Sequence, residues 1–309
     1  MIHRGEIKFM CKLSVLSGVL LAVLSGLPAA AQVDFTGEWA PLYHEDNPER
    51  IPGPELGDYM GIPINNAARL RGDAYDADRI SVVTEYQCRP HGGDYSMRGL
   101  ANMRIDYEYN DSDKLVAIHT RMNFQEQART IYMDGREHPG ELAAHTFQGS
   151  STGTWDNNML NVSTDHLKES YLRRNGLPRS DKATFTDHWV RHGNYLTITT
   201  AISDPVFLEE TFVRSQTWVL DPGQRMGKDI CESVPEIIKP GVVPNHLPGT
   251  NPFLHEVSDW YGVPYNAVRG GAATLYPEFR QKMDKVQNVP EKCERYCKCG
   301  QNGGGCNLQ

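Results

Sequence analysis

The sequence predicts a mostly β protein organised around an antiparallel β-barrel or sandwich. Between residues 102 and 220, apolar and polar side chains alternate along short runs, which is the pattern of half-buried strands. Turn signals separate the runs, among them Asp134-Gly135, a strong hairpin dipeptide. Roughly seven or eight runs at spacings of about 8 to 20 residues are typical of an antiparallel barrel or sandwich.

Residues 1–31 have the pattern of a secretory signal peptide. Basic side chains come first, an apolar run over residues 13–24 follows, and small residues lead to a cleavage site after Ala31. No later stretch contains the roughly 20 apolar residues of a membrane-spanning helix. We therefore expect a periplasmic or secreted protein.

The segment over residues 32–100 precedes most of the barrel. A short strand is expected over 33–40, followed by a proline-rich stretch over 41–64 that we expect to be an extended arm on the surface. Apolar side chains at helical spacing predict a short helix within 65–80, with Asn65 or Asn66 as its N-cap.

The barrel core is assigned to residues 101–222 together with the early strand. Its strands are each bounded by polar or turn residues and each alternate in hydrophobicity. They are expected over 102–109, 115–122, 128–133, 145–155, 159–164, 185–191, 195–202 and 209–220.

From residue 223 to 309 the pattern changes. Prolines interrupt a stretch with little periodicity, and helical patches follow at 254–261 and 276–286. This part buries too little apolar surface to form a core of its own, so we expect a helical, cysteine-rich appendage on the barrel.

The chain contains seven cysteines, and six remain once Cys11 of the leader is set aside. An even number in an exported protein favours disulfides, and we expect one between Cys88 and Cys231 and two within the C-terminal cluster. A four-thiolate metal site in that cluster is the alternative, but it lacks the paired C-x-x-C spacing of the usual zinc site. The cluster consists of Cys293, Cys297, Cys299 and Cys306.

Several short motifs resemble a family of exported bacterial proteins with lipocalin-like, calycin-type β-barrels. The resemblance covers most of the chain to about residue 280 and departs from the family in the cysteine cluster. It implies the barrel fold and export, and it implies no activity. The motifs are FTGxW at 35–39, DGRxHP at 134–139, GxW at 153–155 and RRNGxPRS at 173–180, and Asp204-Pro205 also matches.

Four residues are candidates for catalysis because a histidine beside a carboxylate in a dry pocket suits proton transfer. They are His145, His166, Asp187 and His188. Asp187 and His188 are adjacent in one strand, so only one of them can point into the barrel. The alternative is that these are structural groups with satisfied hydrogen bonds.

Four further residues are candidates for ligand binding. His119 and Arg121 share one face of a strand and would anchor a ligand if that face lined the lumen, or would form a solvated surface if it faced outward. Arg136 and His138 lie in the polar loop after Asp134-Gly135, where barrel proteins often place binding groups. The alternative is that this loop only fixes the turn.

The leading functional hypothesis is an exported barrel that binds a small, mainly apolar ligand in its lumen. The alternatives are a cofactor-free acid–base enzyme of the isomerase, hydratase or lyase type in the same cavity, and a surface or assembly protein that binds a partner through the arm or the tail. The net charge of −8 without a basic stripe argues against nucleic acid. The G-x-S-x-G, H-E-x-x-H, P-loop and G-x-G-x-x-G motifs are not found, so no cofactor is expected.

Overall fold

The computed structural model describes residues 33–42, 56–76, 83, 86–97, 101–123, 127–173, 175–227, 231–234 and 243–288. By its internal contacts the chain divides into one unit over residues 1–34 and another over 35–309. All elements described here belong to the second unit. The expected signal peptide, residues 43–55 of the proline-rich arm and the four cysteines from Cys293 to Cys306 lie outside the described residues.

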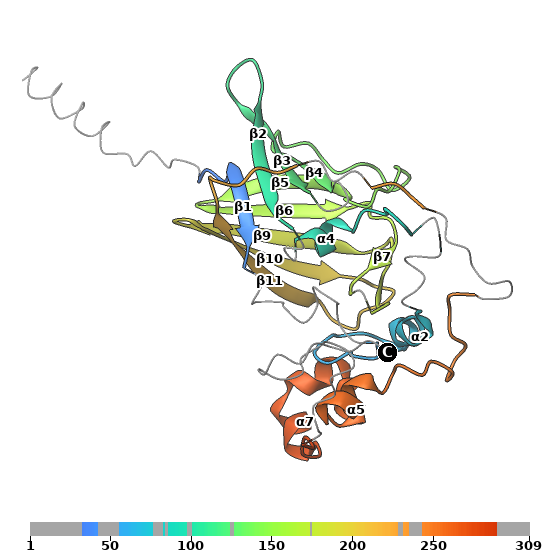
Figure 1. Cartoon of the computed structure of the whole chain (residues 1–309). Helices are drawn as coiled ribbons and strands as arrows, with labels where there is room; N and C mark the ends of the chain where they lie inside the picture. Colours follow the sequence, from blue (N-terminus) through green and yellow to red (C-terminus); the bar gives the residue numbers. More distant parts are fainter. Residues whose placement is uncertain are drawn as a thin grey trace, which may run out of the picture. The chain divides into compact units, whose positions relative to one another are not determined.

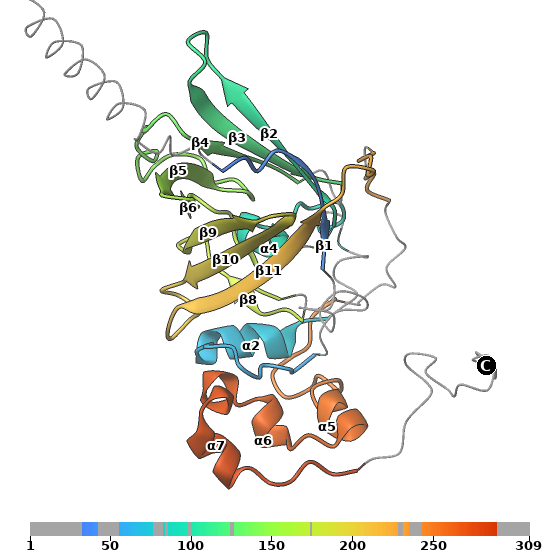
Figure 2. The ribbon, with the colours of Figure 1, turned by 90° about the vertical axis from the view of Figure 1, so that its left-hand side faces the viewer.

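Nine strands form a closed barrel, which confirms the prediction of a mostly β protein and decides between barrel and sandwich. The strands are labelled in Figure 1, and Figure 2 shows β9, β10 and β11 side by side. Around the barrel the order is β1, β11, β10, β9, β6, β5, β4, β3 and β2, and β2 pairs with β1 to close the ring. The strands are β1 Gly37–Pro41, β2 Met103–Tyr109, β3 Leu115–Met122, β4 Ala128–Tyr132, β5 Ser150–Asp156, β6 Met159–Asp165, β9 Thr184–His192, β10 Tyr195–Ser203 and β11 Phe212–Leu220.

The prediction of a purely antiparallel barrel is wrong at one seam. β4 and β5 run parallel, whereas the other neighbouring pairs of the barrel are antiparallel. The cause is the long connection over residues 133–149, which carries the chain back before it enters β5. Parallel neighbours need such a crossover, since a tight hairpin reverses the chain.

Alternate side chains of each strand point into the barrel, as the period of two requires. In β9, Phe185, Asp187 and Trp189 are buried while Thr186 and His188 between them are partly exposed. Three tryptophans without solvent exposure, Trp39, Trp189 and Trp218, contribute much of the apolar filling. The lumen therefore contains the main core of the molecule.

Helix α4, Gly93–Ser96, lies within the ring of strands in Figure 2. Its four residues are buried, and the Gly93 N–H donates to the Phe147 carbonyl at 3.0 Å. Asp94 forms an ion pair with Arg179 at 3.2 Å, with both side chains at 0% exposure. A short helix of polar residues is thus fixed inside the barrel by buried charges.

Helix α2, Asn66–Ala74, begins where the sequence predicts, with the Asn65 side chain accepting from the Ala68 N–H at 3.0 Å. It ends earlier than expected, and residues 77–80 lie outside the described part of the chain. The stretch before it differs from the predicted surface arm, because Leu56, Tyr59, Ile62 and Ile64 are buried. Tyr59, Ile62 and Ile64 belong to a second hydrophobic cluster, which gives this stretch a packing role despite its prolines. The cluster also includes Phe185, Leu172 and Ile202.

The C-terminal region has short helices that contact α2 and the stretch before it. The Tyr59 N–H donates to the Val268 carbonyl at 2.9 Å, and the Gly61 N–H donates to the Gly271 carbonyl at 3.0 Å. Arg269 donates to Asp73 at 2.5 Å. The elements are α5 Glu256–Tyr261, α6 Tyr265–Val268, a 3-10 helix Gly271–Leu275 and α7 Pro277–Lys282.

A disulfide joins Cys88 and Cys231, which confirms that predicted pair. It connects two segments 143 positions apart in the sequence. Within the described residues, no helix has the length and hydropathy needed to cross a membrane.

Candidate functional site

The barrel wall opens where β4 and β5 separate. Their pairing is confined to Ile131 with Ser151 and Tyr132 with Thr152. The sequence predicts a strand from residue 145, but β5 begins only at Ser150, and the chain before it diverges from β4. A cleft of about 630 Å³ lies at this opening. Small-molecule sites in proteins commonly have volumes of about 300 to 1,000 Å³.

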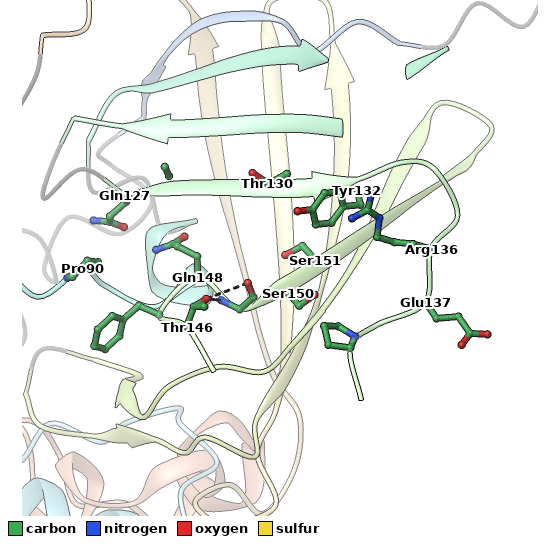
Figure 3. Close-up of a pocket in the computed structure, with 14 residues that line it drawn as sticks. Pro90, Gln127, Thr130, Tyr132, Arg136, Glu137, Thr146, Gln148, Ser150 and Ser151 are labelled. Carbon is green, nitrogen blue, oxygen red and sulfur yellow. Dashed lines mark hydrogen bonds between the residues drawn. The ribbon is translucent and has the colours of Figure 1, made fainter. Parts of the chain in front are cut away.

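Figure 3 shows that the cleft is surrounded by β4, by the loop over residues 136–139 and by the segment over residues 146–151. Hydroxyl and amide groups predominate among its polar side chains, and two prolines, a phenylalanine and a tyrosine ring supply apolar surface. Gln148 is held in place because its side-chain amide donates to the His91 carbonyl at 2.7 Å. The polar lining consists of Gln127, Thr130, Tyr132, Arg136, Glu137, Thr146, Gln148, Ser150 and Ser151.

Arg136 has a defined position at this cleft. Its guanidinium lies 3.7 Å from the centre of the Tyr132 ring and donates to Asp134 at 2.6 Å. The hydrogen bond from Arg136 is the main reason that the pKa of Asp134 falls to about 2. The loop therefore combines both roles that the sequence suggests, because Asp134 fixes the turn and also orients a cation that lines the cleft.

Behind the cleft, the lumen contains a buried ion pair. Arg129 of β4 donates to Asp187 of β9 at 2.7 Å, and their side chains are only 1% and 0% exposed. Arg129 also donates to Ser151 at 3.0 Å and Thr164 at 2.8 Å, and Thr200 donates to Asp187 at 2.6 Å. Since β4 and β9 are not neighbours, the pair spans the interior of the barrel.

Ser151 connects this buried network to the cleft. Its side chain accepts from Arg129 and shares a 2.9 Å hydrogen bond with Thr164, while the residue also lines the cleft. Ser151 is only 1% exposed, so its hydroxyl, which is held by Arg129 and Thr164, forms part of the inner wall of the cleft. The arrangement suits recognition of a hydrogen-bonding group in a fixed position.

Comparison of the chain with protein-family models, with curated proteins and with solved structures gives no match. The function must therefore be inferred from the geometry of the site. Within the described residues, no group of three or more His, Cys, Asp or Glu side chains is arranged to hold a metal ion.

A histidine cluster lies next to the cleft. One oxygen of Asp165 accepts from His138 at 2.9 Å and from His166 at 2.7 Å. The other ring nitrogen of His166 faces the Gly140 carbonyl at 3.0 Å, so both nitrogens face acceptors. The hydrogen bond to Asp165 is the largest cause of the raised pKa of His166, and the Gly140 carbonyl adds to it while burial opposes it. The geometry thus favours an imidazolium at His166.

His138 forms a relay with a hydroxyl and a carboxylate. Its Nδ1 lies 2.9 Å from Asp165, and its Nε2 lies 2.9 Å from the Thr152 hydroxyl. If Nδ1 carries the proton, Nε2 accepts from Thr152, which is the order of groups that activates a hydroxyl nucleophile in many hydrolases. His145 completes the cluster, with its ring centre 5.2 Å from that of His166.

Two of the predicted ligand anchors do not face the lumen. His119 and Arg121 lie on the outer face of β3, because the alternate residues Ile118, Thr120 and Met122 are buried. His119 instead contacts Glu108 at 2.7 Å on the neighbouring strand. The prediction that these two side chains anchor a ligand in the lumen is therefore wrong.

The catalytic candidates are separated into two places. His145 and His166 are brought together with His138, whereas Asp187 points into the lumen and contacts no histidine there in the described residues. His188 points outward and meets the Asn161 side chain at 2.5 Å. Among the described residues, the four candidates therefore do not form one site, because the strand geometry places Asp187 beside Arg129 and His188 on the outer face.

Sequence reasoning missed Arg129 and Thr152. Arg129 lies in the short run Ala-Arg-Thr-Ile-Tyr, where an arginine between small or apolar residues would ordinarily be assigned to the outer face. A signal was present, because Ile131 must face inward and Arg129 shares its face. Thr152 is one of several hydroxyl residues in β5, and nothing in the local sequence distinguishes it.

Proposed function

We propose that this protein binds a small, neutral, hydrogen-bonding molecule in the cleft between β4 and β5. The observation that supports the proposal best is the opening of the barrel wall at the parallel seam, with Ser151 positioned by Arg129 at the inner side of a cleft of about 630 Å³. The ligand class follows from a lining rich in hydroxyl and amide groups. A mainly apolar ligand in the lumen is less well supported, because the buried ion pair occupies part of that space.

Export and membership of the lipocalin-like family are part of the proposal. The Cys88–Cys231 disulfide supports export, because structural disulfides persist in oxidising compartments. A mixed barrel with a parallel seam is the architecture on which the binding site is built.

Ala128→Trp tests the location of the site. Ala128 is exposed and lines the cleft, so an indole there fills the cleft while leaving the barrel core intact. Ser215→Trp on the exposed face of β11 is the matched control. The assay is saturation-transfer NMR with a panel of small neutral sugars, polyols and amides. We expect signals with the wild type and Ser215→Trp that decrease with Ala128→Trp. Equal signals with Ala128→Trp, or no binding from the panel, would contradict the proposal.

A second candidate function is acyl transfer by the Thr152–His138–Asp165 relay. Its support is the pair of 2.9 Å contacts that place His138 between a hydroxyl and a carboxylate next to the cleft. In this reaction the Thr152 oxygen attacks an ester carbonyl, its proton passes to His138 Nε2, and that proton then leaves with the alcohol. Water hydrolyses the acyl-enzyme in the reverse order.

The relay is tested with p-nitrophenyl acetate as substrate. The wild type should release p-nitrophenol with saturable kinetics. In His138→Gln and in Thr152→Val, the rate of release should fall to the rate measured with free imidazole in solution. His119→Gln is the control, since that histidine also bonds a carboxylate and a threonine, but these are Glu108 and Thr130 rather than Asp165 and Thr152. If His138→Gln and His119→Gln behave alike, the relay has no catalytic role.

A further inference from the structure

A second pocket, which shares no lining residue with the cleft, lies between α2, the segment around Cys88 and a small sheet. This sheet is formed by β7, Ser170–Tyr171, and β8, Pro178–Arg179. Its volume is about 260 Å³. This is slightly below the range of about 300 to 1,000 Å³ that is common for drug-sized ligands, so a small molecule would fill it.

Three tyrosine rings form the walls of this pocket. The ring centres of Tyr75 and Tyr171 are 5.5 Å apart at 71°, and those of Tyr86 and Tyr171 are 6.4 Å apart at 39°. Gly176 allows this arrangement, because a Cβ at that position would overlap the Cβ and Cγ of Tyr75. Flat apolar walls of this kind favour a planar ligand, which can pack against a ring at an offset or at an edge.

Two arginines provide positive charge at the pocket. The Arg89 guanidinium lies 4.0 Å from the centre of the Tyr86 ring and 5.4 Å from that of Phe147. Arg71 pairs with Glu169 at 3.2 Å in an exposed ion pair. The lining thus has two cations and one carboxylate, although the whole chain has a net charge of −8. A guanidinium stacked on a ring keeps its N–H groups in its own plane, where they suit a carboxylate.

The disulfide anchors the wall that contains the cation. Cys88 lies between Tyr86 and Arg89 in the chain and is bonded to Cys231. Cys88 also adopts a left-handed backbone conformation with φ of 52°, which is unfavourable for a side chain other than glycine and persists only where the surrounding contacts hold it. A covalent anchor at this point reduces the freedom that Tyr86 and Arg89 would lose on binding a ligand.

We propose that this tyrosine–arginine pocket is a separate binding site for a small planar monoanion, of the aromatic carboxylate class. The rings hold the flat body of the ligand, and Arg89 with Arg71 holds the carboxylate. The size of the pocket limits the ligand to about one ring with a short substituent. This site does not depend on the cleft between β4 and β5.

Isothermal titration calorimetry with three probes tests the proposal on the oxidised full chain. Benzoate has both the ring and the charge, benzamide has the ring without the charge, and acetate has the charge without the ring. We expect saturable binding of benzoate, with at least a tenfold weaker affinity for benzamide and for acetate. Absence of benzoate binding, or equal affinities for benzoate and benzamide, would overturn the proposal.

Variants locate the binding. Arg89→Gln should weaken benzoate at least tenfold and leave benzamide nearly unchanged, and Arg71→Gln, whose side chain is 60% exposed, should weaken benzoate without risk to the fold. Arg225→Gln, in an exposed loop where Arg225 donates to the Pro222 and Gln224 carbonyls, controls for the loss of one positive charge. If Arg89→Gln and Arg71→Gln both match Arg225→Gln, the pocket is not the site. Loss of benzoate binding in Ala128→Trp alone would place benzoate in the cleft and would also overturn the proposal.

Discussion

Removing one partner of the Arg129–Asp187 ion pair should destabilise the protein far more than removing both. Both side chains are essentially inaccessible to water, so a single substitution leaves a buried charge without its counter-ion. Such a change costs about 3 to 5 kcal/mol. We therefore expect Arg129→Met and Asp187→Val each to lower the free energy of unfolding by about that amount.

The double variant Arg129→Met/Asp187→Val should be close to the wild type. Met and Val retain most of the lost volume, and neutral replacement of a buried ion pair is often harmless or stabilising. Ser151 and Thr164 keep their mutual hydrogen bond at 2.9 Å, whereas Thr200 loses its acceptor, at a cost of about 1 kcal/mol. The single variants together lose about 6 to 10 kcal/mol, so non-additivity should exceed about 4 kcal/mol.

Urea denaturation with the disulfide kept oxidised gives these values. Tryptophan fluorescence reports the barrel interior, because Trp39, Trp189 and Trp218 are fully buried. A double variant whose loss equals the sum of the single losses would refute the reasoning, since the two charges would then be independent. Single losses under about 1 kcal/mol would also refute it, because they would mean that water reaches the pair.

Three further predictions concern other parts of the molecule. His166→Gln should lower the free energy of unfolding by about 1 kcal/mol below pH 6.5, where the histidine is protonated in both the folded and the unfolded state. This difference should disappear as the pH rises through the raised pKa of His166. The urea midpoints of variant and wild type should therefore converge at high pH. Gly153→Val should lower the melting temperature by an amount equivalent to about 1 to 3 kcal/mol, because its Cβ would overlap the Met133 sulfur at the β4–β5 seam; an unchanged melting temperature would contradict this. Replacing Cys88 and Cys231 by Ser removes a cross-link between residues 143 positions apart, and chain entropy predicts that the free energy of unfolding falls by about 5 kcal/mol. Denaturant titration measures this loss, and a loss below about 1 kcal/mol would contradict the prediction.

The strands were the most predictable part of the structure. The sequence predicts strands over 115–122 and 195–202, and the structure has Leu115–Met122 and Tyr195–Ser203. Such agreement arises because a strand with one buried face must alternate with a period of two, which short-range pattern alone reveals. The Cys88–Cys231 pair was also predictable, once the remaining cysteines were grouped near the C-terminus.

The candidate site was less predictable, for a physical reason. Alternation shows that His119 and Ile118 face opposite ways, but both faces of this strand carry apolar and polar residues, so the pattern does not show which face is buried. Arg129 adds a second difficulty, because it is buried although arginine usually lies at the surface. The site also depends on a parallel seam set by the long connection before β5, whose path is decided by tertiary contacts. Asp187 illustrates both limits, since its partner is recognised only when β4 is placed across the lumen.

The closure of the barrel by β1 has a consequence for how the chain folds. Trp39 of β1 pairs with Met103 of β2 on one side and with Leu220 of β11 on the other. The first strand of the barrel to be synthesised therefore completes its hydrogen bonding only with the last one. Contacts between distant parts of a chain slow folding. Until β11 emerges from the ribosome, β1 and β10 have an open edge that can pair with other chains. A chain shortened before Phe212 should therefore aggregate even though the other eight strands of the barrel are intact.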